Sequence, residues 1–318
     1  MGARLVSVLR QTIEDNNIIR NSIVKLSGEE HLIAVFIRNG LRWIGCLVCL
    51  LALAVSGWTD AARYTPPEIK VAEGFEVRLA AAPPLVGYPM MACLDDRGRL
   101  YVAESDGRNL TTRQAIEREL PRFVRRLVDV DGDGVFDKST IFADRMTMPE
   151  GGLWHDGALY IISAPYLWRL EDLDDDGVAD KRVKILGSME FDGRANQHGP
   201  YLGPNGRLYF TGGHFGYNLV GTDGSRSGHS RAAGVFSCWP DGSDVRVEGQ
   251  GGINPVDIVF TANGDILSTC AIFDSFGGKR HDALIHWMWG GLTQRVYGSP
   301  LVPETGLRLP AVSRWGQV

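Results

Sequence analysis

The fold is decided by the stretch Met91-Ala-Cys-Leu-Asp-Asp-Arg-Gly98-Arg-Leu-Tyr-Val102, in which two apolar segments flank a short turn with a glycine. The pattern returns three times, as Gly152-Leu-Trp-His-Asp-Gly157-Ala-Leu-Tyr-Ile161, Tyr201-Leu-Gly-Pro-Asn-Gly206-Arg-Leu-Tyr-Phe210 and Ile258-Val-Phe-Thr-Ala-Asn-Gly264-Asp-Ile-Leu267. Because glycine in such turns supplies the positive φ angle of a tight hairpin, each stretch predicts a β-hairpin. The turn glycines are 59, 49 and 58 residues apart, a period that indicates the blades of a β-propeller.

A second kind of segment recurs between these hairpins. It occurs as Arg125-Arg-Leu-Val-Asp-Val130, Leu167-Trp-Arg-Leu-Glu-Asp172 and Gly234-Val-Phe-Ser-Cys-Trp239. These segments supply outer strands, so we expect blades of four strands each. Four blades and part of another, from Ile285 onward, predict a ring of the six-bladed type that is incomplete at its C-terminus. A closed ring of five blades, in which residues 68–80 supply the last strand, is the alternative.

Composition supports an all-β chain without a nucleic-acid partner. The 318 residues include 39 glycines, and the apolar stretches are short and bounded by Gly, Asp, Asn and Pro, as expected for many strands joined by many turns. The net charge is −5, and Lys and Arg are scattered rather than gathered in one stripe. This distribution excludes an electrostatic footprint for nucleic acid.

The N-terminal part resembles an export signal. Residues 44–55 are almost purely apolar, with Arg38 and Arg42 before them and Ala61 and Ala62 after them. This order is that of a secretory signal, and the run is shorter than the ~20 residues of a membrane span. We therefore expect residues 1–62 to be an extension with a signal peptide or uncleaved anchor, and residues 63–318 to be the propeller. The chain would be periplasmic, secreted or held at the cell envelope, with membrane contact through this segment only. The residues ahead of the apolar run indicate either a start codon assigned too early or a short cytoplasmic tail.

Three further runs carry a resemblance to a known family. They are Gly74-Phe-Glu-Val-Arg-Leu-Ala-Ala-Ala-Pro-Pro-Leu-Val86, Asp96-Arg-Gly-Arg-Leu-Tyr-Val-Ala-Glu104, and Asp129-Val-Asp-Gly-Asp-Gly-Val-Phe-Asp137 with Phe142-Ala-Asp144. Over nearly all of residues 68–300 the chain resembles the N-terminal propeller of membrane-bound dehydrogenases of planctomycete-type bacteria. That propeller is similar to glucose/sorbosone dehydrogenases that use pyrroloquinoline quinone, and a haem-binding cytochrome c domain commonly follows it. The resemblance implies oxidation of a sugar or other alcohol and transfer of electrons to a cytochrome c, although no Cys-x-x-Cys-His haem motif occurs in this chain.

Two runs of aspartates have the spacing of calcium ligands. Positions 1, 3, 5 and 9 of an EF-hand-like loop are occupied by Asp129, Asp131, Asp133 and Asp137, and again by Asp172, Asp174, Asp176 and Asp180. Carboxylates at alternate residues around a glycine turn suit Ca²⁺, here in a structural role. Thr140 and Val183 stand where an EF-hand has its bidentate Glu. The alternative is a pair of solvated acidic turns that hold no ion.

His198 is the candidate catalytic residue. The resemblance to the sugar dehydrogenases, which place a His at the start of such a blade, implies that His198 is the general base that takes the hydroxyl proton. An imidazole titrates near neutrality and suits this task. The alternative is a loop histidine that fixes a turn beside Pro200.

The candidate cofactor-binding residues surround His198 in the predicted funnel. They are Arg194, Gln197, His214 and Asn254. Asn254 belongs to Ile253-Asn-Pro255, where the sugar dehydrogenases typically carry Arg-Asn-Pro. Isoleucine lacks the charge of that arginine, which weakens the case for quinone binding, and Lys279 or Arg280 would have to supply it.

Two other classes of function stay open. One is a non-catalytic propeller that binds polysaccharide or protein at the cell envelope, with structural calcium. The other is a propeller lactonase or lyase with a metal in the central channel, which needs inward carboxylates such as Glu104, Glu150 and Asp257. The motifs of serine hydrolases, P-loop and Rossmann nucleotide enzymes and zincins are absent from the sequence.

Overall fold

The structure is a computed structural model that describes residues 67–192, 197–213, 215–229, 233–273 and 280–293, besides four short strands. Only the backbone is described at 272–273, 280–281 and 292–293. The short strands are β1 (Ile23–Val24), β2 (Ile33–Ala34), β20 (Arg308–Leu309) and β21 (Ser313–Trp315). The chain divides into two compact units, Met1–Tyr64 and Thr65–Val318. The apolar run 44–55 and the predicted site residues Arg194 and His214 lie outside the described residues.

The first unit contributes one described pair of strands. β1 pairs with β2 in antiparallel fashion, with Ile23 opposite Ala34. Among the residues described here, no helix has the length and apolarity needed to cross a membrane.

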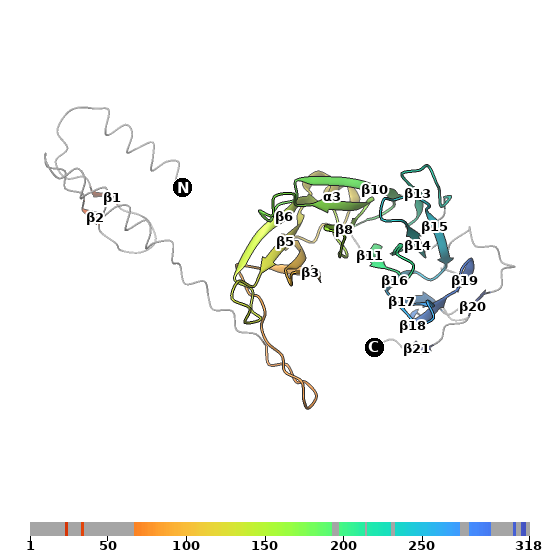
Figure 1. Ribbon diagram of the computed structural model, residues 1–318, viewed down its shortest axis with the longest axis horizontal. Helices are drawn as coiled ribbons and strands as arrows, with labels where there is room; N and C mark the ends of the chain where they lie inside the picture. Colours follow the sequence, from red (N-terminus) through yellow and green to blue (C-terminus); the bar gives the residue numbers. More distant parts are fainter. Residues whose placement is uncertain are drawn as a thin grey trace. The chain divides into compact units, whose positions relative to one another are not determined.

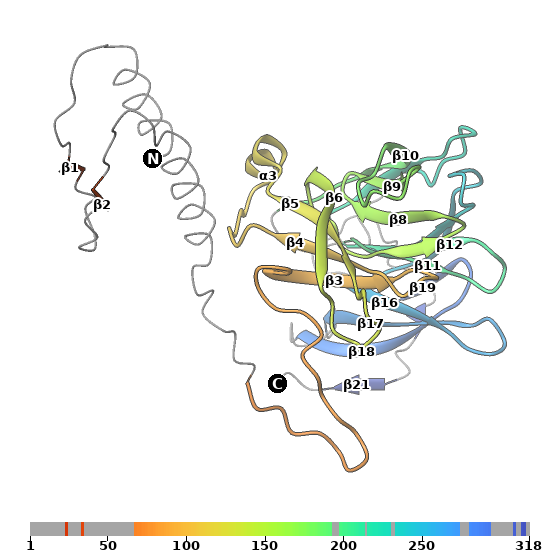
Figure 2. The same cartoon turned by 60° about the vertical axis from the view of Figure 1, so that its left-hand side comes forward.

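The second unit begins with two antiparallel sheets. The first has the order β3 (Tyr88–Leu94), β4 (Leu100–Ser105), β5 (Arg122–Val128) and β6 (Lys138–Met146). The second has the order β7 (Leu153–His155), β8 (Ala158–Ser163), β9 (Tyr166–Glu171) and β10 (Lys181–Met189), with β13 (Tyr217–Val220) paired to β10. Helix α3 (Arg113–Glu119) connects β4 to β5 and lies at their end in Figure 2. Its N-cap is Thr112, whose side chain accepts the Ala115 N–H.

Two further sheets follow in the same order. The third consists of β11 (Gln197–Leu202), β12 (Leu208–Gly212), β14 (Gly234–Cys238) and β15 (Arg246–Gln250), extended by β19 (Gly291–Thr293) and β20. The fourth consists of β16 (Asn254–Phe260), β17 (Ile266–Phe273), β18 (Arg280–Trp287) and β21. Figure 1 shows the sheets following one another in chain order, from orange to blue.

The first strands of the sheets lie next to one another. β3 contacts β7, β7 contacts β11, and β11 contacts β16. Four-stranded antiparallel sheets whose first strands meet in this way form a propeller-like fold. The expected hairpins are present as β3–β4, β7–β8, β11–β12 and β16–β17, and the expected outer strands as β5, β9 and β14.

The core lies between neighbouring sheets and explains why the middle strands are buried on both faces. Successive side chains of a strand point to opposite faces. In β8, Leu159 and Ile161 pack against the first sheet, whereas Tyr160 and Ile162 pack toward the third. β12 follows the same rule, because Phe210 packs toward the second sheet and Tyr209 toward the fourth. Each interface is therefore filled by alternate residues of the two sheets that form it.

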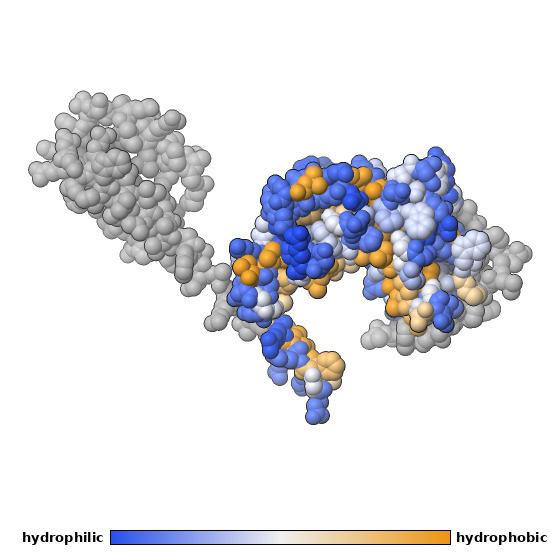
Figure 3. Space-filling view, viewed as in Figure 1, coloured by the Kyte–Doolittle hydropathy of each residue, from blue (hydrophilic) through white to orange (hydrophobic). Residues whose placement is uncertain are grey.

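Residues 67–87 form no strand. The large apolar side chains of this segment include Ile69, Phe75 and Val77, which are 55%, 74% and 52% exposed. The segment projects from the sheets in Figure 1, and apolar side chains appear on it in the space-filling view of Figure 3. The alternative of a ring closed by residues 68–80 thus finds no support in the pairing of the described strands.

Candidate functional site

Three polar side chains act on His198, from β16 and from the chain before β7. His198 belongs to β11, Glu150 lies just before β7, and Asn254 and Asp257 belong to β16. The His198 Nδ1 atom is 3.8 Å from Glu150 Oε2, and the two side chains are 12% and 14% exposed. The Asp257 charge and a hydrogen bond of the Asn254 side chain both act on the ionisation of His198. The first strands of consecutive sheets therefore build one polar site.

A close approach of two backbones places Glu150 beside His198. The Gly199 N–H donates to the Glu150 carbonyl over 3.3 Å. A Cβ added to Gly151 would lie 2.1 Å from the Gly199 carbonyl oxygen, and Gly151 itself has φ +145°. Only glycine accommodates both the contact and the backbone angle. The glycines that follow the two site residues are thus required by the packing of β11 against the chain before β7.

His198 is a buried imidazole whose surroundings favour the neutral form. Its backbone N–H donates to Thr211 Oγ1 over 3.2 Å, and its Nε2 atom is buried without a hydrogen-bond partner. Burial lowers the pKa of His198, while the Asp257 charge and the Asn254 side chain raise it to a smaller extent. The Asn254 side chain acts on the imidazole through a hydrogen bond, and a neutral imidazole can accept a proton from a bound molecule.

Glu150 is a carboxyl group that titrates near neutrality. Burial raises the pKa of Glu150 to about 7, and the Arg122 guanidinium counteracts part of this rise. Arg122 comes from β5 and donates to the Thr147 carbonyl over 2.7 Å. Glu150 can therefore face the His198 Nδ1–H as a carboxylate above this pH and as a neutral acid below it.

Asp257 is held by unusual backbone geometry. It has φ +55°, and the pairing of β16 with β17 shifts register between Val256 and Val259. β-Bulges redirect side chains next to functional sites, and a strained φ in a residue other than glycine points to a functional constraint. The Tyr201 hydroxyl donates to Asp257 Oδ1 over 2.6 Å. Burial and this carboxylate raise the pKa of Tyr201, which keeps the hydroxyl protonated as a donor.

Two other predicted side chains are engaged elsewhere. Gln197 is 3% exposed, and its Nε2 donates to the Glu190 carbonyl over 2.7 Å. Glu104 is 1% exposed and accepts the Gly87 N–H and Arg125 Nε, over 2.6 and 2.7 Å. Glu104 thus anchors the entry to β3 and does not join Glu150 and Asp257 at His198.

The sequence did not single out Tyr201, Thr211 or Arg122, although Tyr201 donates to Asp257, Thr211 accepts the His198 backbone N–H and the Arg122 charge acts on Glu150. Glu150 entered only as one carboxylate of a metal-channel alternative. A signal for it existed, because Glu150 and His198 each stand just before a glycine at the start of a repeated hairpin.

Both aspartate loops bring carboxylates together. Asp129, Asp131 and Asp137 offer oxygens within 4.8 Å of one another, and so do Asp172, Asp174 and Asp176. The remaining predicted ligands bond to the backbone of their own loops: Asp133 accepts the Val135 N–H over 2.8 Å and Asp180 accepts the Leu173 N–H over 2.7 Å. In each loop, three of the four aspartates that the sequence predicts as calcium ligands therefore form an acidic cluster.

Comparisons with known proteins give distant structural likenesses and one family. The chain is similar to the PQQ-bound aldose sugar dehydrogenase of Streptomyces coelicolor, with 15% identity, a TM-score of 0.48 and coverage of 76% of this chain and 71% of that one. It is similar to the PQQ domain of pyranose dehydrogenase from Coprinopsis cinerea, with 14% identity and a TM-score of 0.46, over 66% of this chain. The match spans only 55% of that domain. At these identities the likeness concerns the fold alone. A search of curated proteins gave no match. A family model matches residues 64–272, most of the chain, which therefore belongs to the family described as a domain of unknown function, DUF7133.

Proposed function

We propose that this propeller is an enzyme that acts on a small polyhydroxylated substrate, a sugar or a sugar lactone, with His198 as its general base. The observation that supports it is the environment of His198, a buried imidazole whose Nδ1 atom lies 3.8 Å from the Glu150 carboxyl group and whose ring is also hydrogen-bonded by the Asn254 side chain. A carboxylate that faces one nitrogen stabilises the imidazolium that forms when the other nitrogen takes a proton. Glu150 is accordingly a positioning residue.

The cations that the sequence predicts for the quinone, Arg194, Lys279 and Arg280, have side chains outside the described residues. Pyrroloquinoline quinone carries three carboxylates and needs cations around it. The site has two carboxylates, Glu150 and Asp257, and Ile253 brings no charge. Arg122 is the cation that the described residues place beside Glu150, and it is buried.

The site suits hydrolysis of a lactone better, because this reaction needs a base and no anionic cofactor. His198 Nε2 takes a proton from water as the water oxygen forms a bond to the lactone carbonyl carbon. The ring C–O bond then breaks, and the same proton passes from Nε2 to the departing ring oxygen. The product is a hydroxy acid, and the imidazole returns to its neutral form. Asn254, whose side chain hydrogen-bonds to His198, helps to position the imidazole for this step.

The proposal that the chain is exported is based on its N-terminal sequence. Residues 44–55, flanked by Arg42 and Ala61, have the order of a secretory signal. We propose a periplasmic or cell-envelope location, where the substrate would be an extracellular sugar derivative.

The decisive experiment compares two assays on the purified full-length chain. Hydrolysis of a panel of sugar lactones is followed by proton release against an enzyme-free blank. Oxidation of the corresponding sugars is followed by dye reduction with added pyrroloquinoline quinone and Ca²⁺. Each assay is repeated with His198→Ala, and with His155→Ala as a matched control, because His155 lies at the end of β7 near Tyr160 and outside the site.

We expect lactone hydrolysis that falls by about 10²–10⁴-fold in His198→Ala and persists in His155→Ala. Quinone-dependent sugar oxidation without lactone hydrolysis would overturn the proposed reaction in favour of a dehydrogenase. A folded chain that binds sugar but turns over neither substrate would exclude the enzyme and indicate a non-catalytic propeller that binds sugar.

A further inference from the structure

The two aspartate loops are alike in sequence, but they differ in the hydrogen bonding of one carboxylate oxygen. In the loop of residues 172–180, Asp172 has a side chain that is 4% exposed, and its Oδ1 atom is buried without a hydrogen-bond partner. Its Oδ2 atom is satisfied, because it accepts the Gly177 N–H and Arg126 Nη1, each over 2.9 Å. A buried carboxylate oxygen without a partner is costly, so Oδ1 lacks a ligand that the protein itself does not supply.

Asp172 belongs to a group of three carboxylates. Asp172, Asp174 and Asp176 offer oxygens that lie within 4.8 Å of one another. Arg97, Arg99 and Arg126 make their ion pairs in this loop with Asp172 and Asp175. Among the described residues, neither Asp174 nor Asp176 has a guanidinium partner, so their charges remain uncompensated beside Asp172 Oδ1. Oxygen donors in this number and with this charge suit a hard divalent cation.

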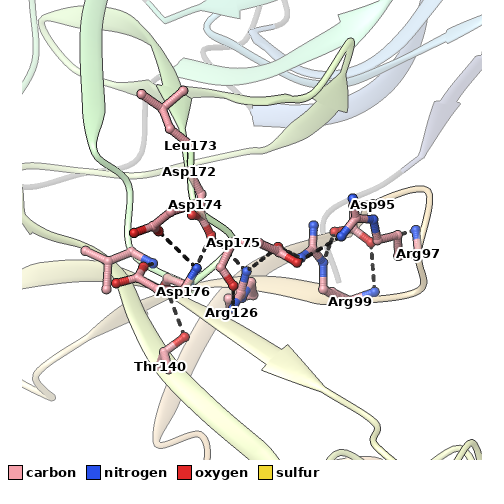
Figure 4. A network of polar contacts seen from close by, with 12 residues as sticks. Asp95, Arg97, Arg99, Arg126, Thr140, Asp172, Leu173, Asp174, Asp175 and Asp176 are labelled. Atoms are coloured by element: carbon pink, nitrogen blue, oxygen red, sulfur yellow. Dashed lines mark hydrogen bonds and ion pairs between the residues drawn. The ribbon is translucent and has the colours of Figure 1, made fainter.

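The loop also joins two sheets, as Figure 4 shows. It follows β9 of the second sheet, and Arg126 comes from β5 of the first. Thr140 of β6 donates to the Gly177 carbonyl over 3.1 Å, and the Ala179 N–H donates to the Phe142 carbonyl over 2.8 Å. A Cβ added to Gly177 would lie 2.5 Å from both Arg126 Nη2 and Thr140 Oγ1. The loop is therefore packed tightly onto the first sheet.

In the loop of residues 129–137, the aspartate equivalent to Asp172 has no oxygen without a partner. Both oxygens of Asp129 accept backbone N–H groups of the same loop, from Gly132 over 2.7 Å and from Gly134 over 2.9 Å. The Phe136 N–H donates to the Ala80 carbonyl, in the segment before β3. An ion bound there would order its own loop but would not connect two sheets.

We propose that residues 172–180 bind a calcium ion through Asp172, Asp174 and Asp176, and that this ion fastens the second sheet to the first. Binding at this loop stabilises the folded propeller, since the site requires the loop to be docked and does not exist in the unfolded chain. Calcium is preferred to magnesium, because ligands spread along a loop tolerate the irregular coordination of Ca²⁺ better than the strict octahedron of Mg²⁺.

The test is thermal unfolding of the full-length chain after dialysis against EGTA, with CaCl₂, MgCl₂ or NaCl added at matched ionic strength. At a Ca²⁺ concentration about a hundredfold above its Kd, the unfolding temperature should rise by roughly 5–10 °C, with less effect from Mg²⁺ and none specific to NaCl. Isothermal titration calorimetry on the same sample measures the binding itself.

The diagnostic variant is Asp174→Asn, because Asp174 accepts only the Asp176 N–H in its loop and holds no arginine. Its matched control is Asp131→Asn, the equivalent position of the other loop, where Asp131 accepts the Asp133 N–H. We expect the Ca²⁺-dependent shift to disappear in Asp174→Asn and to persist in Asp131→Asn. Asp176→Asn serves as a second variant if Asp174→Asn fails to fold.

A wild-type chain without heat of Ca²⁺ binding, or a full shift in Asp174→Asn, overturns the proposal. So does a shift that is lost in Asp131→Asn and kept in Asp174→Asn, which would assign the stabilising ion to the loop of residues 129–137.

Discussion

The Nδ1 atom of His198 lies 3.8 Å from the Oε2 atom of Glu150, and the two residues belong to the entries of different sheets. Burial moves their pKa values in opposite directions, down for His198 and up to about 7 for Glu150. Groups whose pKa values are displaced by their surroundings mark the chemistry of a site.

The first prediction concerns the pH dependence of activity. Catalysis by neutral His198 is favoured when Glu150 is ionised, so kcat should rise with pH through about 7, the raised pKa of Glu150. Glu150→Gln should lower kcat by roughly 10–100-fold and flatten this rise, with a smaller effect on KM. Initial rates measured from pH 5 to pH 9 check both points. A Glu150→Gln variant that keeps the wild-type pH profile would show that Glu150 does not act on His198.

The second prediction links the same carboxyl group to stability. A carboxyl pKa that is raised on folding from 4.5 to about 7 stabilises the fold fully below pH 4.5, and this contribution is lost as the pH rises through 7. The loss amounts to roughly 2–3 kcal/mol between pH 4.5 and pH 8. Urea unfolding at several pH values should show this slope in the wild-type chain and a shallower one in Glu150→Gln. Equal slopes in the two chains would contradict the assignment.

The third prediction concerns the contact between Gly151 and Gly199. Gly151→Ala places a Cβ 2.1 Å from the Gly199 carbonyl oxygen, so it should destabilise the fold by about 2–4 kcal/mol and displace Glu150 from His198. Gly87→Ala is the matched control, since nothing lies within 4 Å of its added Cβ. Denaturant unfolding measures both variants. Comparable stability of the two would show that the chain before β7 can move away from β11 at little cost.

The fourth prediction compares two phenylalanines. Phe210 is 0% exposed between the second and third sheets, whereas Phe75 is 74% exposed. Phe210→Ala should cost about 3–5 kcal/mol of unfolding free energy, and Phe75→Ala should change it by no more than about 0.5 kcal/mol. A large loss of stability in Phe75→Ala would mean that the segment 67–87 is covered in solution. Unfolding curves of the two variants measure both effects.

The strands were predictable because their signals are local. A glycine such as Gly98 or Gly206, with φ +76° and +80°, ends one apolar run and starts another within a few residues. The sequence therefore predicted the hairpins β3–β4 and β11–β12 and the outer strands β5, β9 and β14. The aspartate clusters were equally accessible, since their ligands lie within nine residues of each other in the chain.

The site was predictable only in part. His198 and Asn254 were named from a resemblance, and Glu150 and Asp257 only as carboxylates for a metal. Their convergence depends on Gly151 touching Gly199, a contact between backbones 48 residues apart that no local pattern encodes. The side chain of Gln197, next to His198, donates instead to the Glu190 carbonyl.

The sequence by itself determined the all-β class, the repeated four-stranded sheets and the spacing of both acidic loops, because turn glycines and alternating apolar residues act over a few positions. Only the tertiary structure decided which carboxylates face His198 and which aspartate loop packs against a second sheet. Those outcomes depend on how the entries of separate sheets approach one another, where burial raises the pKa of Glu150 to about 7 and leaves one oxygen of Asp172 without a partner.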